Sequence, residues 1–390
     1  MKTLIELYDE RPVENVLAGE IFRPETIVFL CPAEAAQDKA MQRKMREFYA
    51  HRGVKTELVF LESSIYNAQK IKKQLRTVTE TYPDCVLDIT GGTDAALFAG
   101  GALCAETGIP AFTYSRSKNM FFDIHNAPMA EDLKCETEYS VEDCFLMAGG
   151  ALRTGRVDNS ILAGYMDVIN PFFDLYMKYR RDWVDIVGYI QRVSYVPKDE
   201  PVYLDVTGNF EVKSERGGRI SANEPALVDI KDLGFISGLK VSRADGVSFR
   251  FRDETVRTFL RDVGMVLELY VYKAFLDSGL FSDVVTSAVV DWDSDHMREG
   301  VTNEIDVMAT RGIVPVFVSC KTGDISTEAI NELAVLRDRF GGNIAKAAIV
   351  TAERCRAITR HRASDLDIKI IDYDDLSSGP LGHHIEMLMK

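Results

Sequence analysis

The chain has 390 residues, which is more than one hydrophobic core normally serves and predicts two or three domains. Its hydrophobic content of 46% and charged content of 27% are those of an ordinary globular protein, and no apolar run is long enough to cross a bilayer. The formal net charge of −14 argues against extensive non-specific binding to duplex nucleic acid, although it does not exclude a local basic surface.

The cysteines and the N-terminal residues indicate the compartment. Seven cysteines are scattered along the chain, and none forms a C-x-x-C pair, which favours reduced thiols over a zinc site or a disulfide framework. The first 17 residues contain several acids and lack the apolar centre of a signal peptide. We therefore expect a cytoplasmic protein with no membrane partner.

Strands and helices alternate through the first 150 residues. Apolar runs predict strands at 26–31, 58–62, 85–90, 110–115 and 120–125, and helical patterns lie at 33–53, 65–83 and 94–108. This alternation is typical of a parallel sheet that is covered by helices on both faces. We predict an α/β domain of Rossmann-like type over residues 1–150, closed by a helix at 140–152.

Three loops of this domain are expected at one edge of its sheet, where ligands of parallel sheets bind. One contains glycines and hydroxyls at a helix start, which allow a phosphate to approach the backbone. A glycine-rich helix start without any ligand is the alternative for that loop, and the absence of G-x-G-x-x-G argues against a nicotinamide cofactor. The candidate ligand-binding residues are Pro32 and Ala33, then Thr90, Gly91, Gly92 and Thr93, then Ser115, Arg116 and Asn119.

The middle of the chain has a different pattern. Residues 161–193 read as largely helical with a break near Pro171, and short strands with glycine turns follow residue 201. We predict a small α+β connector over 151–253, which fits a winged helix.

The last part, residues 254–390, reads as helix, three strands, helix, strand, helix and strand. The predicted helices are 254–279, 328–342 and 352–367, and the predicted strands are 282–293, 303–312, 314–323, 345–352 and 368–376. A tight turn between the second and third strands predicts a hairpin, which brings their polar residues together.

Two polar side chains are expected to meet on this hairpin. Because side chains alternate along a strand, Glu304 and Asp306 share one face of the second strand, and Ser319 and Lys321 share one face of the third. Carboxylates bind hard cations such as Mg²⁺ or Mn²⁺, and a lysine stabilises developing negative charge. The pattern suits phosphodiester hydrolysis, and the alternative is a simple surface ion pair.

Two further residues complete the predicted site. Glu268 lies in an otherwise apolar stretch of the preceding helix, and the main-chain carbonyl of Cys320 can join the metal shell. The string Asp306…Ser319-x-Lys321 resembles the PD-(D/E)xK restriction-endonuclease-like family. It departs from that pattern at Ser319, where Asp or Glu is usual, which leaves the number of metal ions open and gives Glu304 a compensating role.

Together with the Asp88–Thr93 string D-I-T-G-G-T, the chain resembles the CARF-domain CRISPR ancillary nucleases. The resemblance implies a Rossmann-like CARF sensor, a connector and a PD-(D/E)xK nuclease. It also implies that cyclic oligoadenylate, with cyclic tetra-adenylate the first choice, binds across a homodimer and activates metal-dependent cleavage in type III CRISPR antiviral defence. The implied catalytic residues are Glu268, Glu304, Asp306, Ser319 and Lys321, and the implied metal ligands are Glu268, Asp306 and Cys320.

Several alternatives stay open. DNA and RNA are both candidate substrates, and the ring size of the activator is not fixed by the sequence. Ser319 favours a non-catalytic, DNA-binding regulator with a degenerate nuclease fold. A constitutive repair nuclease is the third reading. Because no acid–base pair flanks the glycine loop, we expect that the activator is not degraded there.

Overall fold

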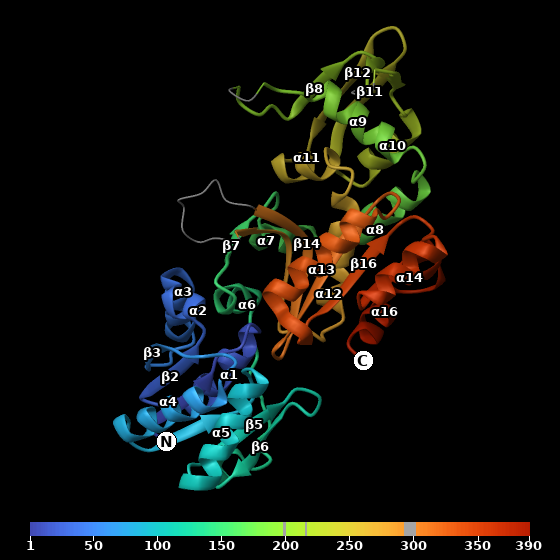
Figure 1. Cartoon of the computed structure of the whole chain (residues 1–390). Coiled ribbons are helices and arrows are strands. Elements are labelled where there is room, and N and C mark those ends of the chain that lie inside the picture. Colours follow the sequence, from blue (N-terminus) through green and yellow to red (C-terminus); the bar gives the residue numbers. More distant parts are fainter. Residues whose placement is uncertain (198–199, 215–216, 292–301) are drawn as a thin grey trace.

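The computed structural model describes residues 1–197, 200–214, 217–291 and 302–390, which form three parts (Figure 1). The N-terminal α/β domain and the connector lie at opposite ends, with the C-terminal α/β domain between them. The chain therefore passes along the C-terminal domain before it forms the connector, through β7 (Ala151–Thr154), α7 (Asn159–Leu162) and α8 (Met166–Lys178). In the part of the chain that the structure describes, no helix is both long and apolar enough to cross a membrane.

The N-terminal domain is a six-stranded sheet of order β3-β2-β1-β4-β5-β6, and its α/β class is as predicted. The sequence missed β1, because Glu6 interrupts its apolar run, yet β1 is central and Glu6 is buried. The last strand, β6, is antiparallel to β5, since the short link between them cannot make a crossover. The strands are β1 (Thr3–Leu7), β2 (Thr26–Cys31), β3 (Glu57–Glu62), β4 (Cys85–Asp88), β5 (Ala111–Ser115) and β6 (Met120–His125).

Side-chain caps define the helices of this domain. The predicted helix at 33–53 is two helices, because the Asp38 side chain accepts from the Met41 backbone N–H and starts a new helix there. The predicted closing helix at 140–152 ends early, where Gly149 adopts φ 81°. The helices are α1 (Leu17–Phe22), α2 (Ala33–Gln37), α3 (Lys39–His51), α4 (Ala68–Thr81), α5 (Asp94–Thr107) and α6 (Val141–Met147), with short 3₁₀ turns at Pro12–Asn15 (η1) and Pro128–Ala130 (η2).

The C-terminal sheet has the order β17-β16-β15-β14-β13-β7. Its edge strand β7 comes from residues that the sequence analysis placed in the connector, and it pairs antiparallel with β13. The predicted strand at 282–293 is confirmed as far as Asp291, and its last two residues lie outside the described residues. The other strands are β13 (Asp283–Asp291), β14 (Thr302–Arg311), β15 (Val314–Lys321), β16 (Lys346–Thr351) and β17 (Ile368–Ile371).

The helices of the C-terminal domain cover both faces of this sheet. The predicted helix at 254–279 is broken into α11 and α12, where the Asp262 side chain accepts from the backbone N–H groups of Gly264 and Met265. The helices are α11 (Glu254–Leu260), α12 (Met265–Asp277), α13 (Thr327–Gly341), α14 (Ala357–Asp365), α15 (Tyr373–Ser378) and α16 (Leu381–Leu388), with a 3₁₀ turn at Gly342–Ile344 (η4).

The connector is an α+β unit, as predicted. A three-stranded sheet of order β11-β12-β8 and a separate hairpin of β9 and β10 accompany its helices. The predicted break near Pro171 is wrong, since α8 continues through it while Phe172 and Phe173 bury their rings in the core. The elements are η3 (Ala163–Tyr165), α9 (Trp183–Val193), α10 (Glu224–Asp232), β8 (Asp205–Gly208), β9 (Glu211–Lys213), β10 (Arg219–Ser221), β11 (Ile236–Ser242) and β12 (Gly246–Phe251).

Two hydrophobic cores attach the outer parts to opposite faces of the C-terminal sheet. On β15, Phe317 belongs to a core that continues into the N-terminal domain, whereas Val318 belongs to the core of α12 and the connector. The first core includes a ring contact between Phe145 on α6 and Phe340 on α13, with centroids 4.9 Å apart. Both outer parts are thus joined to the C-terminal domain by continuous apolar packing.

Candidate functional site

Asp306 on β14 and Lys321 at the end of β15 lie side by side, as the sequence predicted. The Asp306 carboxylate accepts a hydrogen bond of 2.6 Å from the Cys320 backbone N–H and one of 3.1 Å from the Ser319 hydroxyl. The Lys321 ammonium lies 3.7 Å from the same oxygen. Ser319, which stands where an acid is usual, therefore donates to Asp306 and helps to orient it.

Glu268 is the buried acid of this site. It lies on α12, a helix that is apolar on nearly all sides, and its side chain is only 4% exposed. The Ser287 hydroxyl donates to it at 3.3 Å. Burial and the nearby charge of Asp306 raise the pKa of Glu268 to about 8, while the Arg156 charge opposes that shift. Arg156 contacts both Glu268 and Glu304, and it thereby connects Glu268 to β14, the strand that carries Asp306.

A row of residues across three strands carries this site. The flanking strand pairs place Ser287 on β13 opposite Asp306 and Asp306 opposite Ser319, and Gly155, directly after β7, lies against Ser287. Ser287 has a left-handed backbone, with φ 51°, which is uncommon for a residue other than glycine. The polar residues of the site thus follow from sheet register.

Sequence reasoning missed two members of the site, Arg156 and Asp262. The Arg156 guanidinium binds Glu304 through Nε at 2.7 Å and Glu268 through Nη2 at 3.3 Å, and it pairs with Asp262 through Nη1. Arg156 lies between β7 and α7, more than a hundred residues from Glu268 along the chain. No local motif marks it, because its placement depends on β7 joining the C-terminal sheet.

The donor set fits a hard divalent cation. Asp306, Glu268 and Glu304 offer carboxylate oxygens, which Mg²⁺ and Mn²⁺ prefer. Among residues 1–197, 200–214, 217–291 and 302–390, no three His, Cys, Asp or Glu side chains converge closely enough to hold a metal alone. Mg²⁺ commonly binds through one or two carboxylates with water and substrate phosphate completing its shell, so this arrangement suits it.

The side chain of Cys320 does not belong to the polar site. It is buried in the α12 core, and burial raises the pKa of its thiol well above the usual value, so it stays protonated. Its backbone N–H holds Asp306. The metal-binding role of its carbonyl stays a prediction.

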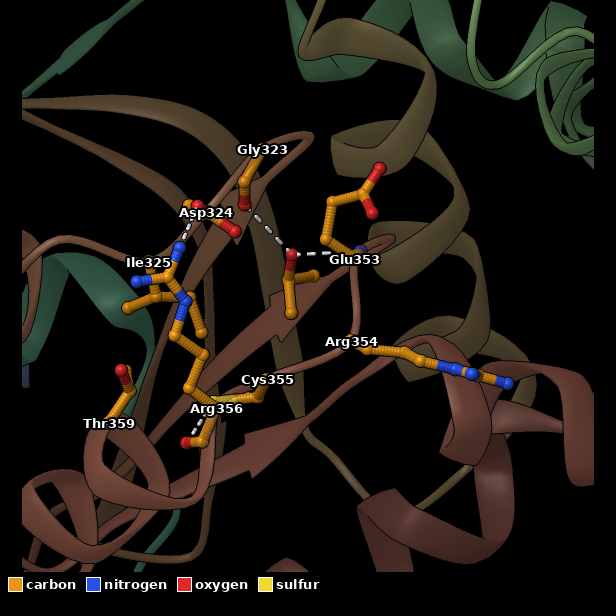
Figure 2. A pocket seen from close by; sticks show the side chains of 9 residues that line it. Gly323, Asp324, Ile325, Glu353, Arg354, Cys355, Arg356 and Thr359 are labelled. Atoms are coloured by element: carbon orange, nitrogen blue, oxygen red, sulfur yellow. Dashed lines mark hydrogen bonds and ion pairs between the residues drawn. The ribbon is translucent and has the colours of Figure 1, made fainter.

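A polar pocket lies just beyond Lys321, at the ends of β15 and β16 (Figure 2). Arg356 reaches Asp324 at 3.1 Å, and Arg354 extends away to Asp374 at 3.0 Å. Each of these two arginines is thus paired with an acid in the structure. The pocket is lined by Gly323, Asp324, Ile325, Thr351, Glu353, Arg354, Cys355, Arg356 and Thr359.

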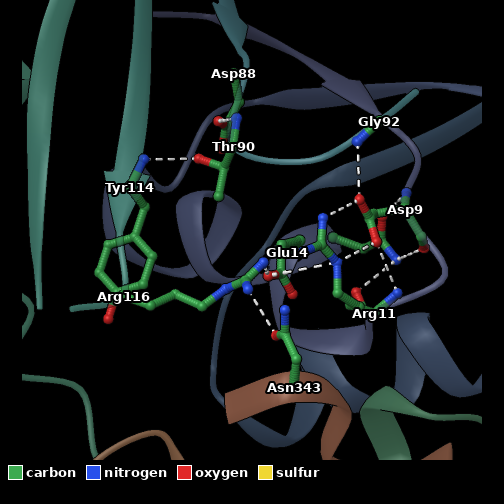
Figure 3. A network of polar contacts seen from close by, with 10 residues as sticks. Asp9, Arg11, Glu14, Asp88, Thr90, Gly92, Tyr114, Arg116 and Asn343 are labelled. Atoms are coloured by element: carbon green, nitrogen blue, oxygen red, sulfur yellow. Dashed lines mark hydrogen bonds and ion pairs between the residues drawn. The ribbon is translucent and has the colours of Figure 1, made fainter. Parts of the chain in front are cut away.

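The glycine loop after β4 is packed against the N-terminal strand (Figure 3). The Thr90 backbone N–H donates to Asp88 at 2.7 Å, and the Thr90 hydroxyl accepts from the Tyr114 N–H at 2.8 Å. Asp88 is buried, and this burial raises its pKa to about 7 although the Thr90 hydrogen bonds oppose the shift. The loop is thus held in place by the buried Asp88 carboxyl group.

Steric crowding explains why positions 91 and 92 are glycines. A Cβ at Gly91 would lie 2.9 Å from the Asp9 Cβ, and one at Gly92 would lie 2.7 Å from the Leu7 Cβ. The Gly92 N–H donates to Asp9 at 3.0 Å. Thr93 caps α5, since its hydroxyl accepts from the Ala96 N–H at 3.3 Å.

The other predicted ligand residues lie in loops at the same edge of the sheet. Pro32 and Ala33 start α2 directly after β2, and the Ser115 hydroxyl lies 3.3 Å from that of Ser117 after β5. Asn119 is used within its own loop, where it accepts from the Tyr114 hydroxyl at 2.6 Å and donates to the Cys135 carbonyl at 2.8 Å.

Arg116 connects this edge to the C-terminal domain. Figure 3 shows its guanidinium between Glu14 and Asn343, where it pairs with the carboxylate and donates to the amide oxygen at 2.6 Å. Glu14 lies near Arg11, which pairs with Asp9. The sequence analysis missed Asp9, Arg11 and Glu14 because it missed β1, the strand that they follow.

Known proteins resemble this chain in its fold and in its C-terminal domain. Residues 253–387 match the family model described as the Card1-like endonuclease domain. The chain resembles the crystal structure of protein VC1899 from Vibrio cholerae, with 17% identity over 99% of this chain and 97% of that chain and a TM-score of 0.73. It also resembles Can2 from Sulfobacillus thermosulfidooxidans in complex with cyclic tetra-adenylate, with 16% identity over 100% of this chain and 97% of that chain and a TM-score of 0.70.

A search among curated proteins returned no match. The two structural relatives cover nearly the whole chain, and the family model covers its C-terminal domain. The chain therefore shares the fold of the VC1899 and Can2 structures over nearly its whole length, and its residues 253–387 match the Card1-like endonuclease domain.

Proposed function

We propose that this protein is a divalent-metal-dependent endonuclease that is activated by a cyclic oligoadenylate, with cyclic tetra-adenylate the first candidate. The observation that carries the proposal is the placement of Asp306, which is held by Cys320 and Ser319, beside Lys321 and the buried Glu268. The match of residues 253–387 to an endonuclease domain supports it.

The residues have separate roles in the proposed cleavage. Asp306 and Glu268 would hold the metal, with Glu304 as the compensating acid, and a bound Mg²⁺ or Mn²⁺ would polarise a phosphoryl oxygen and make its bound water more acidic. Lys321 orients that water or stabilises the negative charge that develops on the phosphate. Ser319 fixes the orientation of Asp306 by its hydrogen bond. DNA and RNA are both substrates to be tested.

The activator site is proposed at the loop edge of the N-terminal sheet. Thr90 to Thr93, Pro32 and Ala33, and Ser115 to Asn119 lie there. The structural relative Can2 was solved with cyclic tetra-adenylate, which supports this ligand class. A ring with an even number of units fits the axis of a homodimer, where both chains can offer the same loop.

Exposed apolar side chains near this edge support the homodimer. Phe98 on α5 is 72% exposed and Tyr66 is 86% exposed. The Thr93 hydroxyl donates to the Ile65 carbonyl at 2.9 Å, which brings the Tyr66 loop to the start of α5. Large exposed aromatic side chains are enriched at protein interfaces.

The test is cleavage of labelled single-stranded DNA, supercoiled DNA and RNA, with Mn²⁺ or Mg²⁺ and with or without cyclic tetra-adenylate. Wild type, Lys321→Ala and the control Lys273→Ala are compared, because Lys273 forms an exposed ion pair with Asp277 on α12. We expect ligand-dependent cleavage by wild type and the control, and a loss of at least about 100-fold in Lys321→Ala. Equal cleavage by Lys321→Ala would overturn the assignment.

A non-catalytic, DNA-binding regulator is the second candidate, because Ser319 replaces the usual acid. It predicts no cleavage under any condition together with retained binding of nucleic acid. A constitutive nuclease predicts equal cleavage with and without the ligand.

A further inference from the structure

Arg156 is placed among the acids of the site by all three guanidinium nitrogens. Each nitrogen contacts a different carboxylate: Nε contacts Glu304, Nη2 contacts Glu268, and Nη1 contacts Asp262. These acids come from β14, from α12 and from the turn before α12. Glu268 and Glu304 are also two of the acids proposed to hold the metal, so a cation of the chain itself occupies their oxygens.

The backbone at Arg156 is fixed by the contacts of its neighbours, Gly155 and Asn159. A Cβ at Gly155 would lie 1.8 Å from the Ser287 carbonyl oxygen, so only glycine lets the backbone approach β13 this closely. The Asn159 amide then pairs with both backbone groups of Thr286, accepting from N at 2.9 Å and donating to O at 3.1 Å. The segment is therefore fastened to β13 beside the strained Ser287, whose hydroxyl binds Glu268.

We propose that Arg156 is a cation with two positions in the nuclease site. Without a divalent ion it holds Glu268 and Glu304, and when they bind a divalent ion it turns to a phosphate of the nucleic acid. The inference rests on the proposed nuclease function. It follows from charge, since a guanidinium and a divalent cation compete for the same carboxylate oxygens.

The second position follows from the chemistry of arginine. A guanidinium binds phosphate oxygens through two parallel N–H groups, and it stays charged when its partners change. The Arg156 side chain is 38% exposed, whereas Glu268 is 4% exposed, so Arg156 can reach a ligand at the surface of the site. The Lys321 ammonium near Asp306 is a point charge, and Arg156 adds a forked donor to the site.

Mn²⁺ binding tests the competition without any cleavage. The affinity of the full-length protein for Mn²⁺ is measured by calorimetry for wild type, Arg156→Gln, Arg156→Lys and the control Arg153→Gln. Arg153 is three residues earlier and pairs at 2.5 Å with Asp291, outside the site. We expect Arg156→Gln to bind Mn²⁺ about fivefold more tightly, with Arg156→Lys between it and wild type. An unchanged or weaker Mn²⁺ affinity in Arg156→Gln would overturn the proposal.

Binding of a labelled oligonucleotide tests the second position. In Ca²⁺, which fills carboxylate sites, Arg156→Gln is expected to bind the oligonucleotide about tenfold more weakly than wild type or Arg153→Gln. Equal oligonucleotide affinity would contradict the phosphate contact. If Arg156 had only a structural role, its replacement would lower the melting temperature and weaken the binding of both Mn²⁺ and the oligonucleotide. That is the opposite of the expected Mn²⁺ result. Failure of the proposed nuclease function can be distinguished from failure of this proposal. The first appears as absent cleavage, and the two binding measurements can still be interpreted without it.

Discussion

At the scale of single residues, the site depends on how Asp306 is held. Its carboxylate has two donors from β15, the Cys320 backbone N–H and the Ser319 hydroxyl, and a lysine beside them. An acid at position 319 would place a second negative charge next to Asp306. A serine provides a donor there, and its hydroxyl helps to orient the Asp306 carboxylate.

Removal of the Ser319 hydroxyl should therefore slow cleavage without abolishing it. In Ser319→Ala the Cys320 N–H still holds Asp306, and one hydrogen bond of about 1 to 2 kcal/mol is lost. We expect kcat/KM to fall about tenfold while the melting temperature changes little. Ser242→Ala, which removes a side-chain hydrogen bond to Asp245 in the turn between β11 and β12 of the connector, is the control in the same kinetic assay. A complete loss of activity in Ser319→Ala would show that the hydroxyl has a more direct role.

Asp88 makes the stability of the N-terminal domain depend on pH. Its pKa is about 7 in the folded chain, above the ordinary value of 3.8, because burial disfavours its charged form. As the pH rises from about 4 to 7 the unfolded state loses its proton first, so the folded state is progressively destabilised, by up to about 4 kcal/mol.

Asp88→Asn removes this penalty and keeps an oxygen that can accept from Thr90. The variant should lose less stability than wild type between pH 5 and pH 8, as measured by the thermal unfolding of both proteins across that range. Asp132→Asn, at an exposed site whose positive φ suits asparagine, should follow wild type. A parallel pH dependence in Asp88→Asn and wild type would refute this role for Asp88.

At the scale of elements, the sequence predicted what local patterns encode. Alternation placed Asp306 and Lys321 together, and continuous apolar runs found most strands. It missed β1, because Glu6 interrupts a run of five residues, and it missed β7, which is short and becomes a strand by pairing with β13. The sequence did not predict the role of Arg156 for the same reason, since its contacts to Glu268 and Glu304 depend on the long-range pairing of β7 with β13.

Helix α5 is the element on which we base a prediction about the homodimer. Its Phe98 is 72% exposed next to the proposed ligand loop, which we attribute to a second copy of the chain. Phe98→Glu should shift the protein from dimer to monomer in light scattering and weaken binding of cyclic tetra-adenylate. Ile124→Glu, on the edge strand β6 and 53% exposed, is the matched control and should stay dimeric. An intact dimer in Phe98→Glu would exclude this surface.

At the scale of the whole molecule, the C-terminal domain shares a core with each of its neighbours. One apolar core joins the N-terminal domain to the face of the sheet that α13 covers, and the other joins the connector to the α12 face. The predicted ligand residue Arg116 also contacts Asn343 in η4. A ligand that draws Arg116 away from Asn343 would break a contact between domains, and we predict that this contact couples the two proposed sites.

Asn343→Ala tests this coupling, since it removes the contact without changing a ligand residue. If the ligand-free arrangement is stabilised by that hydrogen bond, Asn343→Ala should bind cyclic tetra-adenylate about fivefold more tightly and show higher cleavage without ligand. Asn331→Ala, whose amide contacts Arg362 in the same domain, is the control. Weaker ligand binding in Asn343→Ala would mean that the contact belongs to the activated state.

The most direct test of the account is the single-turnover cleavage rate in Mn²⁺ as cyclic tetra-adenylate is titrated into the full-length protein. We predict a rate that is low without ligand, rises to saturation at one ring for two chains, and stays at the background value in Lys321→Ala at every ligand concentration. A rate that does not change with the ligand, or a Lys321→Ala variant that cleaves as wild type does, would contradict the assignment of a ligand-activated nuclease centred on Asp306 and Lys321.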